Sequence, residues 1–518
     1  MSTPQHSLLR KVTYTVFSNW SVLITNIVIS FFLAPYIVHK LGNYYYGVWA
    51  IVMQFTGYLY LIDFGVRDSV IKYTSRFNAK KLEGKINETV TSALLLYAVI
   101  ALFGLLLVTI FAFTFQHVFE INIESVNEVR AVVFLSGLTI ALSFMFNVFS
   151  GVLIGLQKFY ICNVYIIIIS FIRLFFIVYL LDAGYGIIAL SGIQLGNGLM
   201  TGLMVLAVTY VTLKKSGYML KLKIRSKVRF YLTVRKLLNY SFIVFINNIA
   251  AKIIFTTDAI VIGIFLNATS VTFYAIAGNL VEYLKQLMVT SSSIFNPLTS
   301  HMDALGDREK IQDIIDQGIR FGFFVGLPIL ATYILLGSKF IGLWMGEEYI
   351  EQSGMILIVL SITQLLSLQQ YSISGVLYGM SQHKTMAKWR VFEALCNIAL
   401  SIYLVEKIGI LGVAIGTAIP HTLVSLIVFP VLAKNVSGVS ILRIYGSILK
   451  SFLVVLPFVA LTLFIKFNIE IESLLEFFIL VFANLVLYII AAYLFLLSKS
   501  EKSVVSRQFA KLPLLNKL

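Results

Sequence analysis

The chain has 518 residues, of which 59% are hydrophobic and only 12% are charged, whereas soluble domains are about 45–50% apolar and about 25% charged. This composition excludes a water-soluble globular fold. The formal net charge of +16 is dispersed over many short segments, so it favours contact with anionic membrane lipids over a nucleic-acid-binding face.

Residues that usually bind metals or form disulfides are few and wrongly spaced. The two cysteines, Cys162 and Cys396, lie in apolar runs, which argues against a disulfide framework or a thiolate metal site. The six histidines lack the HxxxH and HxxE spacings that are typical of zinc hydrolases. We therefore expect no cofactor and no metal.

Apolar segments follow one another along the whole chain. A helix needs about 20 apolar residues to cross ~30 Å of hydrocarbon, and fourteen segments reach roughly this length. The predicted spans cover residues 12–37, 45–64, 92–115, 131–154, 160–181, 187–212, 241–265, 270–295, 319–338, 354–378, 391–405, 410–433, 451–467 and 476–497. No small-residue cleavage site follows the first one, so we expect a retained span and not a signal peptide.

The basic residues predict the orientation of these spans. With the N-terminus inside, the inner segments hold 32 of the 40 Lys and Arg residues, and the outer loops hold five. Because basic residues near span ends stay on the cytoplasmic side, we expect both termini to be cytoplasmic. The outer loops are short, which leaves no room for an external catalytic domain.

An internal repeat relates the two halves. The pentapeptide GVLIG at 151–155 recurs as GVLYG at 375–379, a shift of 224 residues. Two further sets recur with a shift of 225: Leu41, Trp49 and Ala50 as Leu266, Tyr274 and Ala275, and Gly184 and Ala189 as Gly409 and Ala414. Six spans per repeat give both halves the same orientation, as in transporters built from parallel repeats.

The repeat predicts an all-α polytopic membrane protein with two six-helix lobes. The predicted parts are an N-terminal lobe (1–212), a basic cytoplasmic linker (213–240), a C-terminal lobe (241–433), and two additional helices with a cytoplasmic tail (434–518). We expect a cavity between the lobes that opens alternately to either side of the membrane.

Several short motifs keep a fixed order on this frame of six, six and two spans. They are Leu41–Gly42, Tyr46–Ala50, Asp63–Val66 with Ser69 and Lys72–Tyr73, then Asp258–Ile262, Tyr274–Ala275, Trp344–Gly346 and Gly409–Ala414. Together they resemble the polysaccharide and O-antigen flippases (Wzx-like) of the multidrug/oligosaccharidyl-lipid/polysaccharide exporter superfamily, although Lys72 stands where arginine is commoner.

This resemblance implies a transporter with a two-lobed bundle like that of multidrug exporters of the superfamily, and not an enzyme. Its cargo would be an undecaprenyl-diphosphate-linked oligosaccharide, moved to the outer leaflet of the bacterial cytoplasmic membrane for surface polysaccharide synthesis. H+ or Na+ would be the coupling ion, and polymerase and chain-length proteins of the same pathway would be partners.

Two cations within the spans are candidates for binding the cargo diphosphate. A charge near mid-membrane costs about 2.5–3.5 kcal/mol on insertion scales and is a functional hypothesis by default. Arg173 and Lys252 lie near the centres of spans five and seven, where they would donate charge-assisted hydrogen bonds to phosphate. The alternative for Lys252 is an ion pair with Glu282.

Other polar residues of the spans admit both functional and structural interpretations. Asp258 and Glu282 are candidates for ion coupling, while Glu282 and Lys285, three residues apart, can instead satisfy each other. Candidates for an inner gate or a simple interfacial salt bridge are Asp63, Arg67, Asp68 and Lys72. Candidates for contacts with sugar hydroxyls or between helices are Asn19, Asn26, Asn247 and Asn248.

Three other functions fit parts of the pattern. A lipid II flippase would share the number of spans and the basic cavity. A multidrug exporter of the same superfamily would usually have twelve spans and an acidic cavity. A membrane polysaccharide polymerase would need a sizeable outer loop, which the sequence lacks.

Overall fold

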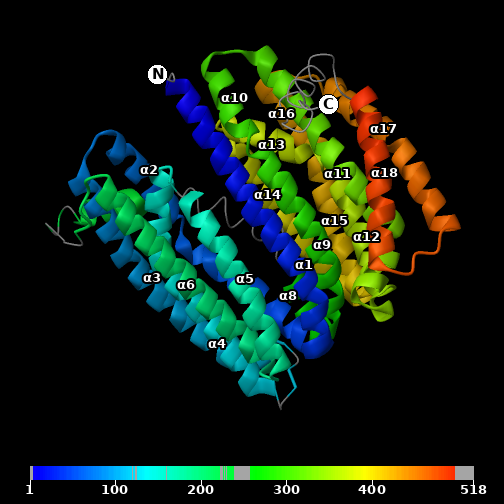
Figure 1. Cartoon of the computed structure of the whole chain (residues 1–518), viewed down its shortest axis with the longest axis horizontal. Helices are drawn as coiled ribbons and strands as arrows, with labels where there is room; N and C mark the ends of the chain where they lie inside the picture. Colours follow the sequence, from blue (N-terminus) through cyan, green and yellow to red (C-terminus); the bar gives the residue numbers. More distant parts are fainter. Residues whose placement is uncertain are drawn as a thin grey trace, which may run out of the picture. The chain divides into compact units, whose positions relative to one another are not determined.

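A computed structural model describes residues 4–119, 121–122, 125–158, 160–221, 226, 228, 230–238 and 257–495, and every regular element in these ranges is a helix (Figure 1). The first elements are α1 (Pro4–Leu59), η1 (Tyr60–Asp63), α2 (Val66–Ala79), α3 (Glu83–Val118), α4 (Val126–Gly155), α5 (Tyr160–Asp182), α6 (Gly186–Lys215) and α8 (Asp258–Phe265). The remaining elements are α9 (Ala268–Ser292), α10 (Phe295–Ala304), α11 (Arg308–Met345), η3 (Glu347–Tyr349), α12 (Gln352–Leu365), α13 (Gln369–Gly379), α14 (His383–Ile408), α15 (Ile410–Leu423), η4 (Val424–Val428), α16 (Phe429–Ser437), α17 (Ile441–Asn468) and α18 (Leu474–Phe495).

The long helices coincide with the predicted spans. Nine helices of the described ranges are long and apolar enough to cross a membrane, or ten if the bent pair α12–α13 is one span. The all-α, multi-pass architecture is therefore confirmed, and fourteen spans remains a prediction. The span predicted at 241–265 lies largely outside the described residues, which resume at Thr257.

The first two predicted spans lie in one helical stretch, α1, that is broken at Gly42. Its φ of 77° and ψ of 165° are not helical and favour glycine. Unbroken, the 56 residues of α1 would extend ~84 Å at 1.5 Å per residue, more than twice the ~30 Å of a bilayer core. The Leu41–Gly42 motif thus divides α1 into two stretches that can each cross a bilayer.

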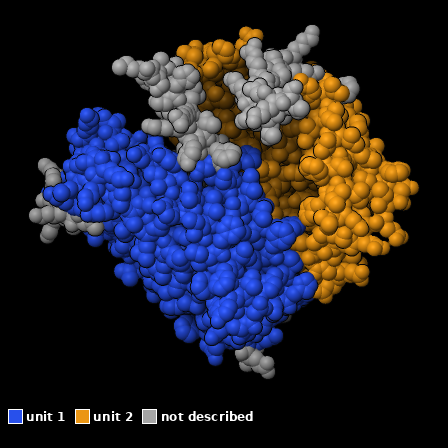
Figure 2. Space-filling model, viewed as in Figure 1, with its two compact units in different colours: residues 1–275 blue, residues 276–518 orange. Residues whose placement is uncertain are grey.

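The chain divides into two compact units, residues 1–275 and 276–518 (Figure 2). In unit 1, α4 packs against α2, α3 and α6, and α5 packs against α1 and α6. In unit 2, α11 packs against α12, α13, α17 and α18, and α14 packs against α15. The four predicted parts of the chain, with their linker, remain a proposal.

Helix α11 provides the core of unit 2. Its buried residues Ile311, Ile315, Ile319, Phe323 and Leu327 recur every four residues, which places them along one side of a helix. The buried cluster around them includes residues of α13, α17 and α18. The two helices appended after the second repeat are therefore packed onto this core.

Each unit uses its repeated glycines for the same close contact. A Cβ added to Gly155 of α4 would lie 2.9 Å from the Ile71 carbonyl oxygen of α2. One added to Gly379 of α13 would lie 2.7 Å from the Asn296 carbonyl oxygen of α10. Ile71 and Asn296 are 225 residues apart and Gly155 and Gly379 are 224 apart. Gly155 and Gly379 thus let two helices approach each other closely in both units, as small residues do between membrane helices.

This packing predicts opposite effects of alanine at two glycines of unit 2. Gly379→Ala should destabilise the protein by about 1–3 kcal/mol, because it overpacks the α10–α13 contact. Gly446→Ala on α17 should be neutral or stabilising, since no described atom lies within 4 Å of its added Cβ and alanine favours a helix. Thermal unfolding of the purified variants measures both, and equal unfolding temperatures would contradict the packing argument.

Candidate functional site

A row of polar contacts joins α1 to α5. The side-chain amide of Asn163 donates to Asn19 Oδ1 at 2.7 Å and to Ser18 Oγ at 2.9 Å. One step along, the Ser170 hydroxyl donates to Asn26 Oδ1 at 3.0 Å. From the first contact to the second, the chain advances seven residues on α1 and seven on α5, which is about two turns of each helix. We call these five residues the α1–α5 polar seam.

Arg173 follows the seam by three residues on α5 and is half-buried. Its Nε has no hydrogen-bond partner among the residues that the structure describes. A helix turns about 100° per residue, so Arg173 shares a face with the buried residues Ile169, Ser170 and Ile177. The opposite face carries the exposed apolar residues Val164, Ile168, Phe171 and Phe175. The guanidinium therefore starts from the same face of α5 as the seam.

The predicted inner-gate residues surround the turn between η1 and α2. Phe64 and Gly65 both have positive φ, 49° and 72°, so the DFGV motif breaks the helix where glycine is favoured. Tyr97 of α3 donates to Asp63 Oδ1. Arg67 acts on Asp63 through its charge and a backbone hydrogen bond.

Two further gate candidates lie on α2, outside the candidate spans. Burial raises the pKa of Asp68, while the charge of Arg67 opposes this rise. Lys72 is exposed, and its Nζ lies 6.0 Å from the ring centroid of Tyr73.

The candidates for ion coupling have separate surroundings. Asp258 is buried and accepts a hydrogen bond from Tyr274. Two of the short motifs of the sequence, Asp258–Ile262 and Tyr274–Ala275, are therefore in contact. Glu282 is exposed and accepts from Gln286 Nε2 at 3.3 Å, and Lys285 is half-buried on the same helix. Lys252, Asn247 and Asn248 lie outside the described residues, so their roles stay predictions.

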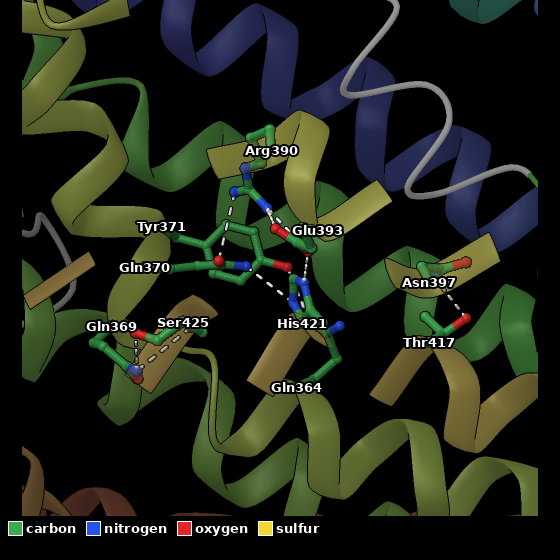
Figure 3. Close-up of polar contacts among 10 residues, drawn as sticks. All are labelled: Gln364, Gln369, Gln370, Tyr371, Arg390, Glu393, Asn397, Thr417, His421 and Ser425. Carbon is green, nitrogen blue, oxygen red and sulfur yellow. Dashed lines mark hydrogen bonds and ion pairs between the residues drawn. The ribbon is translucent and has the colours of Figure 1, made fainter. Parts of the chain in front are cut away.

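Unit 2 contains a buried ionic network that the sequence interpretation missed (Figure 3). Glu393 of α14 accepts a hydrogen bond from Arg390 Nη1 at 3.1 Å and lies 2.6 Å from Nδ1 of His421 on α15. Gln370 of α13 lies between His421 and Arg390. Its Nε2 is 3.0 Å from His421 Nε2, and its Oε1 is 3.4 Å from Arg390 Nη2. The side chains of Glu393 and His421 are 1% and 3% exposed. We call these four residues the Glu393 network.

Neighbouring amides extend this network to other helices. The Tyr371 hydroxyl donates to Gln364 Oε1 at 2.8 Å, from α13 to α12. Gln369 Nε2 donates to the Leu366 carbonyl at 3.0 Å and to the Ser425 carbonyl of η4 at 3.2 Å. The first three residues of α13 thus make hydrogen bonds to η4, to α14 and α15, and to α12, respectively.

Within the described ranges, no group of three or more His, Cys, Asp or Glu side chains could hold a metal ion. The Glu393 network contains two such residues, and its third charged member, Arg390, is a cation. Because a guanidinium offers only donors, this arrangement makes hydrogen bonds among its own members and is unsuited to a divalent metal.

Comparisons with known proteins give a family and a fold. A model of the family described as "Polysaccharide biosynthesis protein" matches residues 8–302, more than half of the chain. A Shigella flexneri protein whose name describes an O-antigen transporter is 24% identical over 387 residues, 74% of this chain and 88% of that protein. A Haloferax volcanii protein whose name describes a low-salt glycan biosynthesis flippase is 24% identical over 185 residues, 36% of this chain and 39% of that protein.

Solved structures with the same fold are transporters. The lipid II flippase MurJ in an inward closed conformation has a TM-score of 0.69 at 16% identity, and the match covers 93% of this chain and 98% of the MurJ chain. An inward-facing multidrug transporter of the MATE family has a TM-score of 0.66 at 13% identity, covering 83% and 98%. At these identities the likeness shows the fold alone.

Proposed function

This chain belongs to the polysaccharide biosynthesis protein family, and from that premise we propose that it is a flippase for an undecaprenyl-diphosphate-linked oligosaccharide. It would carry the repeat unit from the inner to the outer leaflet by alternating access, for surface polysaccharide synthesis. The observation that carries this proposal is the family match over residues 8–302. The Shigella relative, matched over most of both chains, adds support.

The chemistry of the cargo fits the polar residues of unit 1. A diphosphate needs charge compensation in a medium of low dielectric constant, which a guanidinium provides through charge-assisted hydrogen bonds. Arg173 offers an Nε with no partner in the described structure. The α1–α5 polar seam on the same face offers amides and a hydroxyl of the kind that sugar hydroxyls bind.

The setting of this activity is part of the proposal. We place the protein in the bacterial cytoplasmic membrane with both termini inside, because Lys and Arg predominate in the inner segments. An ion gradient would drive export, and the polymerase and chain-length proteins of the pathway would act on the exported unit. Its multi-pass character follows from the nine long apolar helices of the described ranges.

A deletion strain tests the function. Loss of the gene should remove the surface glycan and cause lipid-linked repeat units to accumulate facing the cytoplasm, and the wild-type gene should reverse both effects. Extracted lipids and surface glycan staining measure them. Lysis with accumulated lipid II would instead indicate the cell-wall precursor as cargo, and normal glycan with drug sensitivity would indicate a multidrug exporter.

A further inference from the structure

The hydrogen bonds of the Glu393 network determine where its protons lie. Arg390 has only donors, so the Gln370 amide must turn its oxygen towards Arg390 and its NH2 towards His421. His421 Nε2 must then accept, which leaves the imidazole proton on Nδ1, where it donates to Glu393. The closed ring therefore holds a neutral imidazole, a carboxylate and a guanidinium.

One additional proton is incompatible with this ring. If Nε2 of His421 binds it, two donors face each other, His421 and the Gln370 amide. Turning the amide around repairs this contact and places its NH2 against Arg390, again donor against donor. If Glu393 binds the proton, both His421 and Arg390 lose their anionic acceptor. A protonated Glu393 keeps one oxygen that accepts, without the negative charge, so proton uptake at either residue weakens or breaks contacts of the ring.

The fold itself does not require these charges. The helix pair α5–α6 of unit 1 corresponds to α14–α15 of unit 2 in the internal repeat. With shifts of 224 and 225, Glu393 corresponds to Ile169 or Ile168, and His421 with a shift of 225 corresponds to Gly196. The pair packs in both units, so the same architecture forms without the ionic residues. A buried ion pair is also weak evidence for stability.

The contacts that a proton would break hold two irregular points of unit 2. Gln370 is the second residue of α13, which is bent by 46° from α12 across a three-residue break. His421 follows Pro420 and precedes the π-helical turn η4, an irregularity that is frequent at functional sites. Arg390 also lies over the ring of Phe429, the residue directly after η4, at 5.0 Å. Three of the four contacts of the ring thus join different helices, α13, α14 and α15, beside these irregular points, and the fourth lies within α14.

We infer that the Glu393 network is a proton-binding site, and that its occupancy switches unit 2 between the closed ring described here and a form in which α13 and α15 are bent differently. The proton comes from water and returns to it, without other chemistry. Resting on the proposed function, the inference deepens it: the bound proton couples glycan export to the proton gradient.

Among the described residues, one further titratable side chain interacts with the charged groups of the network. Tyr371 of α13 interacts electrostatically with Arg390 and Glu393 of α14 and with Glu282 of α9. His421 is the titratable group that α15 contributes to the network, and α12 and η4 contribute Gln364 and Ser425. In our inference the proton binds at His421 or Glu393.

The experiment observes the imidazole directly in full-length protein labelled with 15N-histidine in lipid nanodiscs. The spectrum should show an Nδ1–H tautomer at high pH and a doubly protonated imidazole when the pH is lowered. Hydrogen–deuterium exchange in residues 364–371, corrected for intrinsic rates, should rise at least threefold with the same change of pH. His421→Gln assigns the resonance, and His301→Gln, outside the network, is the matched control.

Two variants then connect the site to transport. Glu393→Gln should abolish the pH dependence of exchange, and Glu393→Gln and His421→Gln should each reduce glycan export at least tenfold, while His301→Gln changes neither. Because hydrogen–deuterium exchange of the wild-type protein needs no variant, misfolding of a variant does not affect that measurement.

An Nε2–H tautomer at high pH, no titration, or exchange in residues 364–371 that ignores pH would overturn the inference. So would normal export by both folded network variants. The spectrum and the exchange measurement on the wild type involve no glycan, so they test the inference separately from the proposed function. The proposed function would be overturned by a different result, a deletion strain that keeps its surface glycan.

Discussion

Arg173→Ala should reduce glycan export roughly 10- to 100-fold while the protein remains in the membrane. A hydrogen bond to a charged group contributes about 1.5–3 kcal/mol, and each 1.4 kcal/mol is a factor of ten. Since the Nε of Arg173 has no hydrogen-bond partner in the described structure, removing it breaks no hydrogen bond of that nitrogen. Surface glycan per unit of membrane protein is the measurement.

Two further variants distinguish charge from geometry. Arg173→Lys keeps the charge and loses the planar fork, so export should be intermediate. Arg130→Ala is the matched control, because Arg130 also has a buried Nε without a partner in the described structure, while its Nη2 donates to Gln116 at 3.0 Å and its guanidinium lies over Phe113. This variant should export normally. Normal export by Arg173→Ala would remove this residue from the proposed cargo site.

The sequence predicted the helices well because the signals that define them are local. Apolar runs of span length predicted α3 to α6 and α17 to α18 within several residues at most ends. The break at Gly42 and the two positive-φ residues at Phe64–Gly65 coincide with the motifs singled out in the sequence. Recurring glycines predicted the repeat, and the structure adds a reason for Gly155 and Gly379, a carbonyl oxygen within 3 Å of each added Cβ.

The Glu393 network could not be found in the same way. Glu393 and His421 are 28 residues apart, and only the packing of α14 on α15 brings them together. The predicted span 391–405 began just after Arg390, so both its charge and that of Glu393 read as the polar end of a span. A carboxylate inside one span and a histidine beside proline in the next were the available signals.

The α1–α5 polar seam is an intermediate case. The seven-residue spacing of Asn19 and Asn26 placed both on one face, as the structure shows. Their partners Asn163 and Ser170 have the same spacing, but this match alone does not identify which helix lies opposite. Whether the seam binds sugar hydroxyls is still a prediction.

The stability of Arg390 variants should depend on whether its partner charge is also removed. Arg390→Met alone leaves the carboxylate of Glu393, which is 1% exposed, without its cation, and breaking a buried pair in this way costs about 3–5 kcal/mol. Arg390→Met combined with Glu393→Gln removes both charges, so it should recover at least half of the lost stability. Thermal unfolding of the two single variants and the double variant forms the cycle.

An exposed pair in the same unit provides the control for this cycle. Arg443 and Asp313 are 2.6 Å apart with side chains 37% and 50% exposed, so the corresponding cycle should give at most about 1 kcal/mol. Additive losses at Arg390 and Glu393 would mean that each residue stabilises the fold separately. Strong coupling, with stability recovered in the double variant and export lost, would instead separate stability from transport. A protein that folds without these two charges does not need them for its fold, which leaves proton binding as their role.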